Sequence, residues 1–273
     1  MQIDGAGLIC MRLEAVIWAA VVAIGGLGSI LSIISSREAA VWIFVITFTE
    51  NFRACIMNRK GKLYFRYGTM GSAKTALLLT TAYNFEERNI NYLCLKPVID
   101  TREARNVIRS RIGIERECRW IYHDTNLYEL VKDIYRESGT VIDWFLIDEA
   151  QFLTEQQVDQ LSRVVDDFGS SVICFGLRTD FKSRLFEGSR RLFELADTID
   201  EIKSTCNCGN KTIINARIDA NGDFVEEGAQ VEIGGDDRYV AVCRKCWRNK
   251  RIEQSSRAVL PLFDDEANNN EDI

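Results

Sequence analysis

The sequence predicts an α/β fold in which a parallel sheet is flanked by helices. From about residue 63 to residue 196, short apolar segments typical of strands alternate with amphipathic segments typical of helices. One segment, VIDWFLID (141–148), is apolar almost throughout, as expected of a parallel strand covered on both faces. A glycine-containing turn joins the first strand to the first helix, and this arrangement is common in α/β folds with a ligand site at the sheet edge.

The first half of the alternation has clear local signals. In its first helix, Leu78, Ala82 and Phe85 recur at the spacing of one buried face. Asp124 or Thr125 is positioned to cap the second helix. We therefore predict strands at 62–67, 91–96 and 118–123, and helices at 74–89 and 126–138.

The second half repeats the pattern and then changes character. Thr154 and Gln157 form a Thr-x-x-Gln capping box, and Gly169 marks the end of the same helix. These signals predict a helix at 154–169 between strands at 141–148 and 171–177. Beyond about residue 196, short strands surround two cysteine pairs, and we predict them at 198–205, 211–219, 231–235 and 239–243.

Composition excludes several classes of protein. The chain has 273 residues, a net charge of -6 and a pI of about 5.1, which argues against a protein that wraps nucleic acid. His123 is the single histidine, so a multi-histidine metal site is excluded. The nine cysteines are an odd number, and Cys94, Cys118 and Cys174 lie in apolar runs as buried free thiols would. This usage suits a cytoplasmic protein.

The first 56 residues differ from the rest. Ala15–Ile34 carries no charge and is long enough to span a bilayer, whereas the second apolar run, 39–49, is too short. The segment is a membrane anchor, a signal peptide, or an artefact of a start placed upstream of Met57. A signal peptide would export a thiol-rich domain, and we favour the start at Met57.

We therefore expect four parts along the chain. The extension would be followed by a core, a smaller cysteine-containing subdomain and an acidic, polar tail that is disordered. We place these parts at 1–56, 57–197, 198–250 and 251–273.

The glycine-containing turn, GTMGSAKT, is one residue away from the Walker A pattern G-x-x-x-x-G-K-[ST]. Lys74 would reach the terminal phosphates of a nucleotide, and the Thr75 hydroxyl would bind magnesium. Ala73 occupies the position of the second pattern glycine, and alanine is tolerable there if its φ is helical, with Gly71 adding freedom. The competing interpretation is a strand-to-helix turn without a ligand.

A second acidic motif follows the apolar strand 141–148. Asp148 would hold magnesium, and Glu149 would accept a proton from an attacking hydroxyl or water. The alternative is an acidic strand end that is merely solvated. The letters DEAQ also occur in helicase-like ATPases, but the chain after Gln151 is too short for a second motor lobe.

The two cysteine pairs predict a zinc site. Four thiolates can bind zinc tetrahedrally. The bound zinc would cross-link a region that is too small to have a large hydrophobic core of its own. Free thiols are the alternative. A zinc ion here would clamp residues 209–242 as a loop that is well placed to close over a ligand. The predicted ligands are Cys206, Cys208, Cys243 and Cys246.

Together these motifs resemble the bacterial type II thymidine kinases, a family that includes the human cytosolic type. The resemblance covers about residues 63–247, outside the extension 1–56. Two positions depart from many members, namely Ala73 in place of glycine and Cys246 in place of histidine. The motifs that carry it, in chain order, are KLYFRYGTMGSAKT, DTR (100–102), SRIG (110–113), LIDEAQFL, FGLRTDF, LFEGS, CNCG, IGGDDRYV and CRKC.

The resemblance implies a RecA-like P-loop core with a zinc-held substrate lasso, assembled as a homotetramer. It implies transfer of the γ-phosphate of ATP to thymidine or deoxyuridine, giving dTMP or dUMP for DNA synthesis. The cofactors would be ATP, Mg²⁺ and structural Zn²⁺. No nucleic-acid partner is expected, and a membrane partner is expected only if residues 1–56 belong to the native protein.

Matched residue by residue, the resemblance also implies individual roles. Glu149 falls on the catalytic base, and Thr75 with Asp148 would hold magnesium. The ATP segments would comprise Gly68, Thr69, Met70, Gly71, Ser72, Ala73, Lys74, Thr75, Asp148, Glu149, Ala150 and Gln151. The nucleoside would be held by Phe152, Phe181, Ile233, Gly234, Gly235 and Tyr239.

Two other functions compete with this one. The first is a P-loop ATPase whose zinc module contacts DNA, and the second is a membrane-anchored binding module. ATP consumption stimulated by nucleosides would select the kinase, and hydrolysis stimulated by DNA would select the ATPase.

Overall fold

The computed structural model describes residues 60–98, 106–230 and 238–252, all within one compact unit that begins at Lys60. The extension predicted over 1–56 lies outside these residues. The strand predicted at 231–235 and almost all of the predicted tail also lie outside them. The proposed four-part division of the chain therefore stays a prediction.

The unit is built from ten strands and six helical segments within the described residues. The strands are β1 (Leu63–Gly68), β2 (Tyr92–Pro97), β3 (Val107–Arg109), β4 (Glu115–Glu117), β5 (Arg119–Ile121), β6 (Trp144–Ile147), β7 (Ser171–Gly176), β8 (Thr198–Ile202), β9 (Ile214–Arg217) and β10 (Tyr239–Val242). The helices are α3 (Lys74–Glu86), α4 (Leu127–Ser138), α5 (Glu155–Phe168), α6 (Glu187–Leu195), α7 (Arg244–Arg248) and the short 3₁₀ helix η1 (Ala150–Phe152).

Six of the strands form one sheet in the order β5-β2-β6-β7-β1-β8. Every neighbouring pair in this sheet is parallel, which confirms the predicted parallel α/β fold. All six strands consequently end at the same edge. The central strand β7 lies between β1, which leads into the glycine-containing turn, and β6, which leads into the acidic motif.

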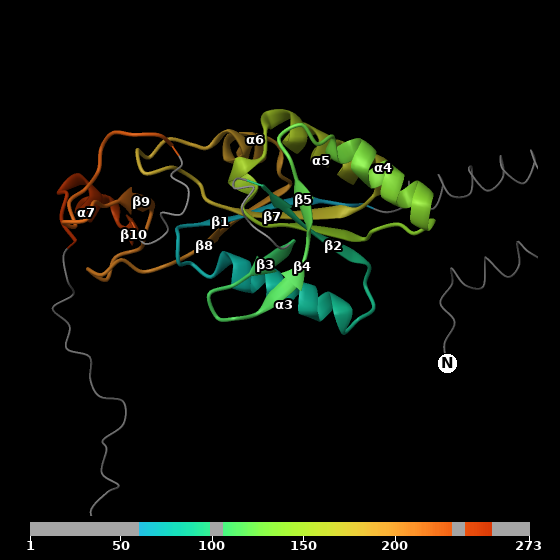
Figure 1. Cartoon of the computed structure of the whole chain (residues 1–273), viewed down its shortest axis with the longest axis horizontal. Coiled ribbons are helices and arrows are strands. Elements are labelled where there is room, and N and C mark those ends of the chain that lie inside the picture. The colour runs from blue at the N-terminus through green and yellow to red at the C-terminus, as the bar shows by residue number, and fades with distance from the viewer. Residues whose placement is uncertain (1–59, 99–105, 231–237, 253–273) are drawn as a thin grey trace, which may run out of the picture. The chain divides into compact units, whose positions relative to one another are not determined.

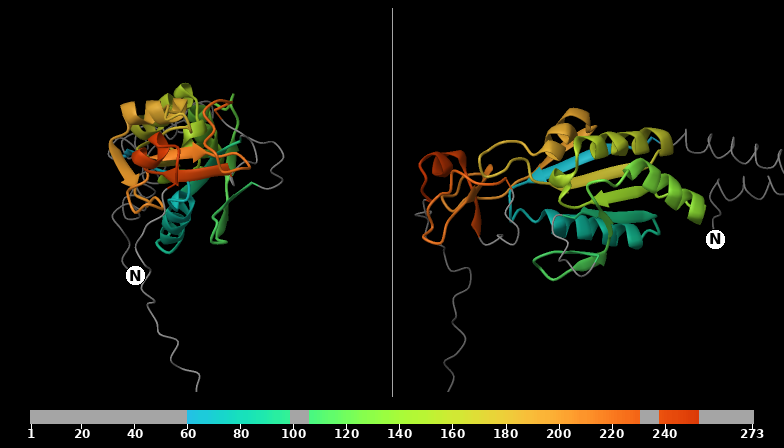
Figure 2. Two further views of the ribbon diagram at one scale, coloured as in Figure 1. Left: turned by 90° about the vertical axis from the view of Figure 1, so that its left-hand side faces the viewer. Right: turned by 45° about the horizontal axis from the view of Figure 1, so that its top comes forward.

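Both faces of the sheet are covered by helices, as Figures 1 and 2 show. Alternate residues of each strand serve opposite faces. In β7, for example, Val172 and Cys174 join the apolar core shared with α4, α5 and α6, whereas Ile173 and Phe175 join the core shared with α3. This arrangement explains why the central strands are apolar on both faces.

The helix ends agree with the sequence signals in α5 but not in α4. Thr154 and Gln157 form both hydrogen bonds of the predicted capping box, and Gly169 ends the helix with a left-handed backbone. The prediction of Asp124 or Thr125 as the cap of α4 is wrong, because the Asn126 side chain accepts the hydrogen bond from the Glu129 N–H. Asn126 immediately precedes the helix, so its side chain reaches the N–H of the third helical residue, whereas the Thr125 hydroxyl accepts from the Tyr122 N–H.

One strand lies elsewhere than expected. The strand predicted at 198–205 beside the cysteine pairs is β8, and it pairs in parallel with β1 in the main sheet. The cysteine-containing segment keeps a separate two-stranded sheet, in which β9 and β10 are antiparallel. Within the described residues, no helix is both long and apolar enough to cross a membrane.

Candidate functional site

The glycine-containing turn and the acidic motif meet at the carboxyl-terminal edge of the main sheet. Residues 69–73 connect β1 to α3, and Asp148 follows β6 directly. The Thr75 hydroxyl donates to the Asp148 carboxylate at 3.1 Å. The structure therefore brings together the two residues predicted to hold magnesium, although they are far apart in the sequence.

Lys74 lies over the turn that precedes it. Its side chain is buried, and Nζ donates to the Thr69 carbonyl at 2.8 Å. This bond folds the lysine back along the loop, and Lys74 is itself the first residue of α3. A cation and a row of helix N–H groups in one place favour a phosphate ligand.

Ala73 does not have the helical backbone that its tolerance was expected to require. Its φ is 62° and its ψ is 25°, so it lies in the left-handed region, and the condition stated for tolerating alanine is not met. The residue is the N-cap of α3, and its left-handed backbone changes the direction of the chain between the turn and the helix. A left-handed alanine costs roughly 1–2 kcal/mol, which explains why glycine is the pattern residue.

The loop also offers an unused polar atom. Ser72 Oγ is buried and has no hydrogen-bond partner among the described residues. A buried hydroxyl without a partner is unfavourable, and a ligand oxygen at the loop would satisfy it. Gly68 is required for close approach, because a Cβ at that position would lie 2.8 Å from the Ile202 carbonyl oxygen. The residues of the loop thus fit a phosphate group.

Asp148 is buried, and burial raises its pKa to about 7, with the adjacent Glu149 charge contributing in the same direction. The hydrogen bond from Thr75 opposes this shift. A carboxylate that is desolvated in this way is stabilised by a cation, because the cation restores the favourable interactions lost with water. The environment of Asp148 is therefore suited to a divalent ion.

Glu149 has an unusual backbone for a glutamate, with φ 51° and ψ 37°. Its carboxylate accepts a hydrogen bond from Gln151 Nε2 at 2.5 Å. Left-handed residues other than glycine are uncommon and cluster at functional sites. The conformation turns Glu149 away from the line of β6, at the point where the strand ends.

The described aromatic residues predicted to hold a nucleoside form two groups. The Phe152 ring packs edge-on against Phe186, at 5.6 Å between centroids. Phe181 and Tyr239 come together through Arg217, whose guanidinium lies 4.0 Å from the Phe181 ring centroid. Ile233, Gly234 and Gly235 lie outside the described residues, as does the DTR motif.

Arg217 is a candidate site residue that the sequence interpretation missed. It is only 5% exposed, and it donates to the Tyr239 hydroxyl and to the Ala229 carbonyl. The sequence signal that could have identified it is an arginine within the predicted strand 211–219. In the structure all residues of β9 are buried. A buried arginine needs partners, and its position between two aromatic rings predicts a role in shaping the surface beside them.

The four predicted zinc ligands form one cluster. The Sγ atoms of Cys206, Cys208, Cys243 and Cys246 all lie within 4.8 Å of one another. The Cys208 and Cys243 sulfurs are 3.6 Å apart, close to the roughly 3.8 Å edge of a tetrahedron with Zn–S bonds of about 2.3 Å. Hydrogen bonds from Asn210 lower the pKa of Cys208 to about 6, which favours the thiolate that a metal binds.

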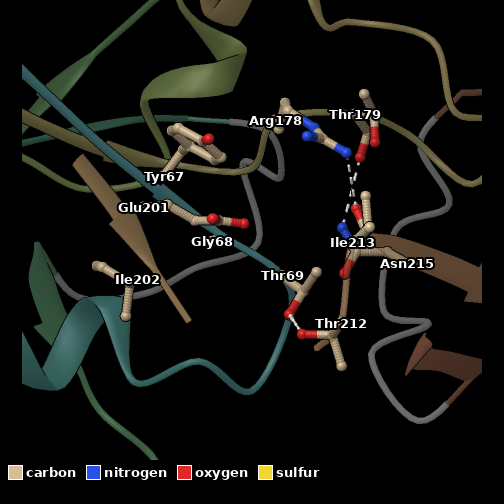
Figure 3. A pocket seen from close by; sticks show the side chains of 10 residues that line it. All are labelled: Tyr67, Gly68, Thr69, Arg178, Thr179, Glu201, Ile202, Thr212, Ile213 and Asn215. Carbon is tan, nitrogen blue, oxygen red and sulfur yellow. Dashed lines mark hydrogen bonds between the residues drawn. The ribbon is translucent and has the colours of Figure 1, made fainter. Parts of the chain in front are cut away.

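The cysteine-containing segment contacts the glycine-containing turn (residues 68–75) directly. Thr69 and Thr212 share a hydrogen bond of 2.8 Å, and the Met70 N–H donates to Asn215 Oδ1 at 2.7 Å. Figure 3 shows Thr69, Thr212 and Asn215 around a pocket that is also lined by the ends of β1 and β8 and by Arg178, Thr179 and Ile213. Asn215 also reaches the Thr179 carbonyl, two residues before Phe181.

The comparisons with known proteins agree with one another. The profile of a family described as thymidine kinase matches residues 61–247. The thymidine kinase of Xanthomonas axonopodis pv. citri is 47% identical over 202 residues, which cover 74% of this chain and 95% of that protein. The thymidine kinase of Mannheimia succiniciproducens is 45% identical over 189 residues, covering 69% and 96%. None of these similarities favours the alternative of an ATPase acting on DNA.

Proposed function

The chain belongs to the thymidine kinase family, and on that premise we propose that it transfers the γ-phosphoryl group of ATP to the 5′-hydroxyl of thymidine or deoxyuridine. The observation that carries the proposal is the junction at the sheet edge. Thr75 and Asp148 are hydrogen-bonded there, and Glu149 follows immediately. A phosphate loop, a magnesium pair and an adjacent carboxylate are the parts that phosphoryl transfer needs.

ATP would be held by residues 68–75, with Lys74 facing the terminal phosphates. The N-terminus of α3 and the unpartnered Ser72 hydroxyl support this assignment. Thr75 and Asp148 would hold magnesium, which supplies charge neutralisation on the phosphate oxygens. In the transfer, the acceptor oxygen bonds to the γ-phosphorus while the bond to the β–γ bridging oxygen breaks.

Glu149 would take the proton that the 5′-hydroxyl loses. A general base must lie within hydrogen-bond reach of the proton that it accepts. Glu149 is suited to this position because it follows the magnesium ligand Asp148 directly and its left-handed backbone turns it out of the strand. The nucleoside would lie against Phe152, Phe181 and Tyr239, together with Ile233, Gly234 and Gly235.

We propose a structural zinc ion for the four-cysteine cluster. Zinc would tie the segment before β9 to the segment after β10, since Cys206 and Cys208 precede β9 and Cys243 and Cys246 follow β10. The role of the cluster would be to hold the base of the loop 209–242, from which Arg217 contacts both Phe181 and Tyr239.

We also propose a homotetramer in the cytoplasm. Tyr83 on α3 is 52% exposed. Ile199 on β8, an edge strand of the main sheet, is also exposed. Large exposed apolar side chains of this kind suit contacts between subunits. Cys94 and Cys174, which are buried outside the cluster, are thiols and not disulfides, which suits a reducing compartment.

The test is transfer of labelled γ-phosphate from ATP to thymidine by the full chain. We expect Mg²⁺-dependent formation of thymidine monophosphate, with deoxyuridine as a second acceptor. Duplex and single-stranded DNA serve as controls. Hydrolysis that responds to DNA and not to nucleosides would overturn the proposal.

A further inference from the structure

The side chain of Gln151 occupies an enclosed position behind Glu149. The residue is 2% exposed, although it is a polar residue in a segment assigned to ATP. Both ends of its amide are used within the protein. Nε2 donates to Glu149 Oε2 at 2.5 Å, and Oε1 accepts from the Leu177 N–H at 2.9 Å. The side chain therefore connects the acidic motif to the end of β7.

The Leu177 contact determines which way round the amide lies. A backbone N–H can only donate, so it selects the amide oxygen and leaves the NH₂ group facing Glu149. A donor next to a carboxylate forms a charge-assisted bond, which is stronger than a bond between neutral groups. The Glu149 carboxylate is thus held from one side by a group that β7 itself orients.

Two glycines keep this arrangement in place. A Cβ at Gly176 would lie 2.9 Å from Gln151 Oε1 and 3.1 Å from its backbone nitrogen. A Cβ at Gly188, on α6, would lie 2.7 Å from the Ala150 carbonyl oxygen. The short helix η1 is consequently packed closely against β7 and α6, without room for a side chain at Gly176 or Gly188. This close packing fixes the position of the segment that carries Gln151.

From this geometry we propose that Gln151 is a positioning residue for the general base. Its amide holds the Glu149 carboxylate in the orientation from which it accepts the 5′-hydroxyl proton. The inference rests on the proposed role of Glu149. An unrestrained glutamate would sample several rotamers, and misplacement of a reacting group by about 1 Å can lower turnover about 100-fold. The hydrogen-bonded amide restricts that freedom.

The test uses Gln151→Glu, which keeps an oxygen for the Leu177 N–H but replaces the donor with a carboxylate. We expect kcat for thymidine to fall about 10- to 100-fold, with KM for ATP changed less than about threefold. A purely structural defect at this position would instead change KM for ATP together with kcat.

Gln160→Glu is the matched control. Gln160 is also buried, and its Oε1 accepts from the Leu127 N–H at 2.8 Å, but it lies on α5 and not at the site. The control should leave both kcat and KM unchanged. If Gln151→Glu behaves like Gln160→Glu, the inference is wrong.

Two further variants keep the outcome unambiguous. Gln151→Met removes both hydrogen bonds with a side chain of similar length, and it replaces Gln151→Glu in the comparison of kcat and KM if that protein does not fold. Glu149→Gln separates the inference from the function on which it rests. Near-normal turnover by Glu149→Gln would refute the base, whereas loss of turnover there with full activity in the Gln151 variants would refute the positioning role alone.

Discussion

Asp148 shows how a single residue can be unfavourable for stability and yet suited to the role proposed for it. It is a carboxylate buried at the end of a buried strand, and its pKa of about 7 reflects the lack of water around it. Thr75 provides one hydrogen bond, which does not offset the burial. A bound divalent cation would compensate the charge, so the same property that destabilises the metal-free protein favours the metal complex.

The stability of the metal-free protein should therefore fall as pH rises. The folded state binds the Asp148 proton more tightly than the unfolded state, because its pKa is raised. The resulting stabilisation is fully present below the unfolded-state pKa and is lost as pH rises through about 7. Asp148→Asn should remove this loss. We expect it to raise the free energy of unfolding at about pH 8 by at least about 1.4 kcal/mol, the equivalent of one pKa unit.

Urea denaturation in a chelator, at about pH 5 and about pH 8, measures this difference. Saturating Mg²⁺ should restore the stability of the unsubstituted protein and have no comparable effect on Asp148→Asn. An equal dependence on pH in both proteins would contradict the account of Asp148.

At the scale of elements, the sequence predicted most of the sheet and its helices, because these depend on local patterns. It also predicted that Thr75 and Asp148 would meet, because the ends of parallel strands share one edge. It did not predict Arg217 against Phe181, since that contact joins two segments with no common pattern. The pairing of β8 with β1 was missed for the same reason.

The backbone at the start of α3 was another limit of the sequence. The identity of a residue does not determine its φ, and an alanine at position 73 gave no indication that the backbone there is left-handed. The cap of α4 shows the same limit on a smaller scale, because three consecutive polar residues could each serve and only Asn126 has the right geometry.

Ala73→Gly should stabilise the protein by about 1 kcal/mol, because it relieves the left-handed strain at the N-cap of α3. The midpoint of thermal unfolding should rise by about 2–4 °C. Ala76→Gly is the control. It lies within the same helix, where glycine should instead lower stability by about 0.5–1 kcal/mol. A lower midpoint for Ala73→Gly would show that the strain is not present in solution.

At the scale of the whole unit, hydrogen bonds connect the segment between the cysteine pairs to the glycine-containing turn (residues 68–75). Thr212 and Asn215 contact Thr69 and Met70, and both lie between the cysteine pairs in the chain. The zinc ion proposed for the cluster would therefore support the loop as well as its own segment. The same connection extends to Phe181 through Asn215 and Arg217.

Removal of the proposed zinc should weaken ATP binding about tenfold, corresponding to one or two lost hydrogen bonds at the loop. Calorimetric titration with ATP before and after chelation measures the change, with metal content followed in parallel. Cys118→Ser is the control, since Cys118 is buried outside the cluster and should not affect the metal. Unchanged ATP affinity after complete loss of metal would disprove the connection.

The most direct test of the central claim compares Glu149→Gln with the unsubstituted chain in two measurements on the same preparation, thymidine binding and thymidine monophosphate formation. The account predicts that the variant binds thymidine with near-normal affinity and loses at least about 100-fold in kcat, because general base catalysis contributes about 10²–10⁴-fold. Near-normal turnover by the variant would contradict the assignment of Glu149 as the base.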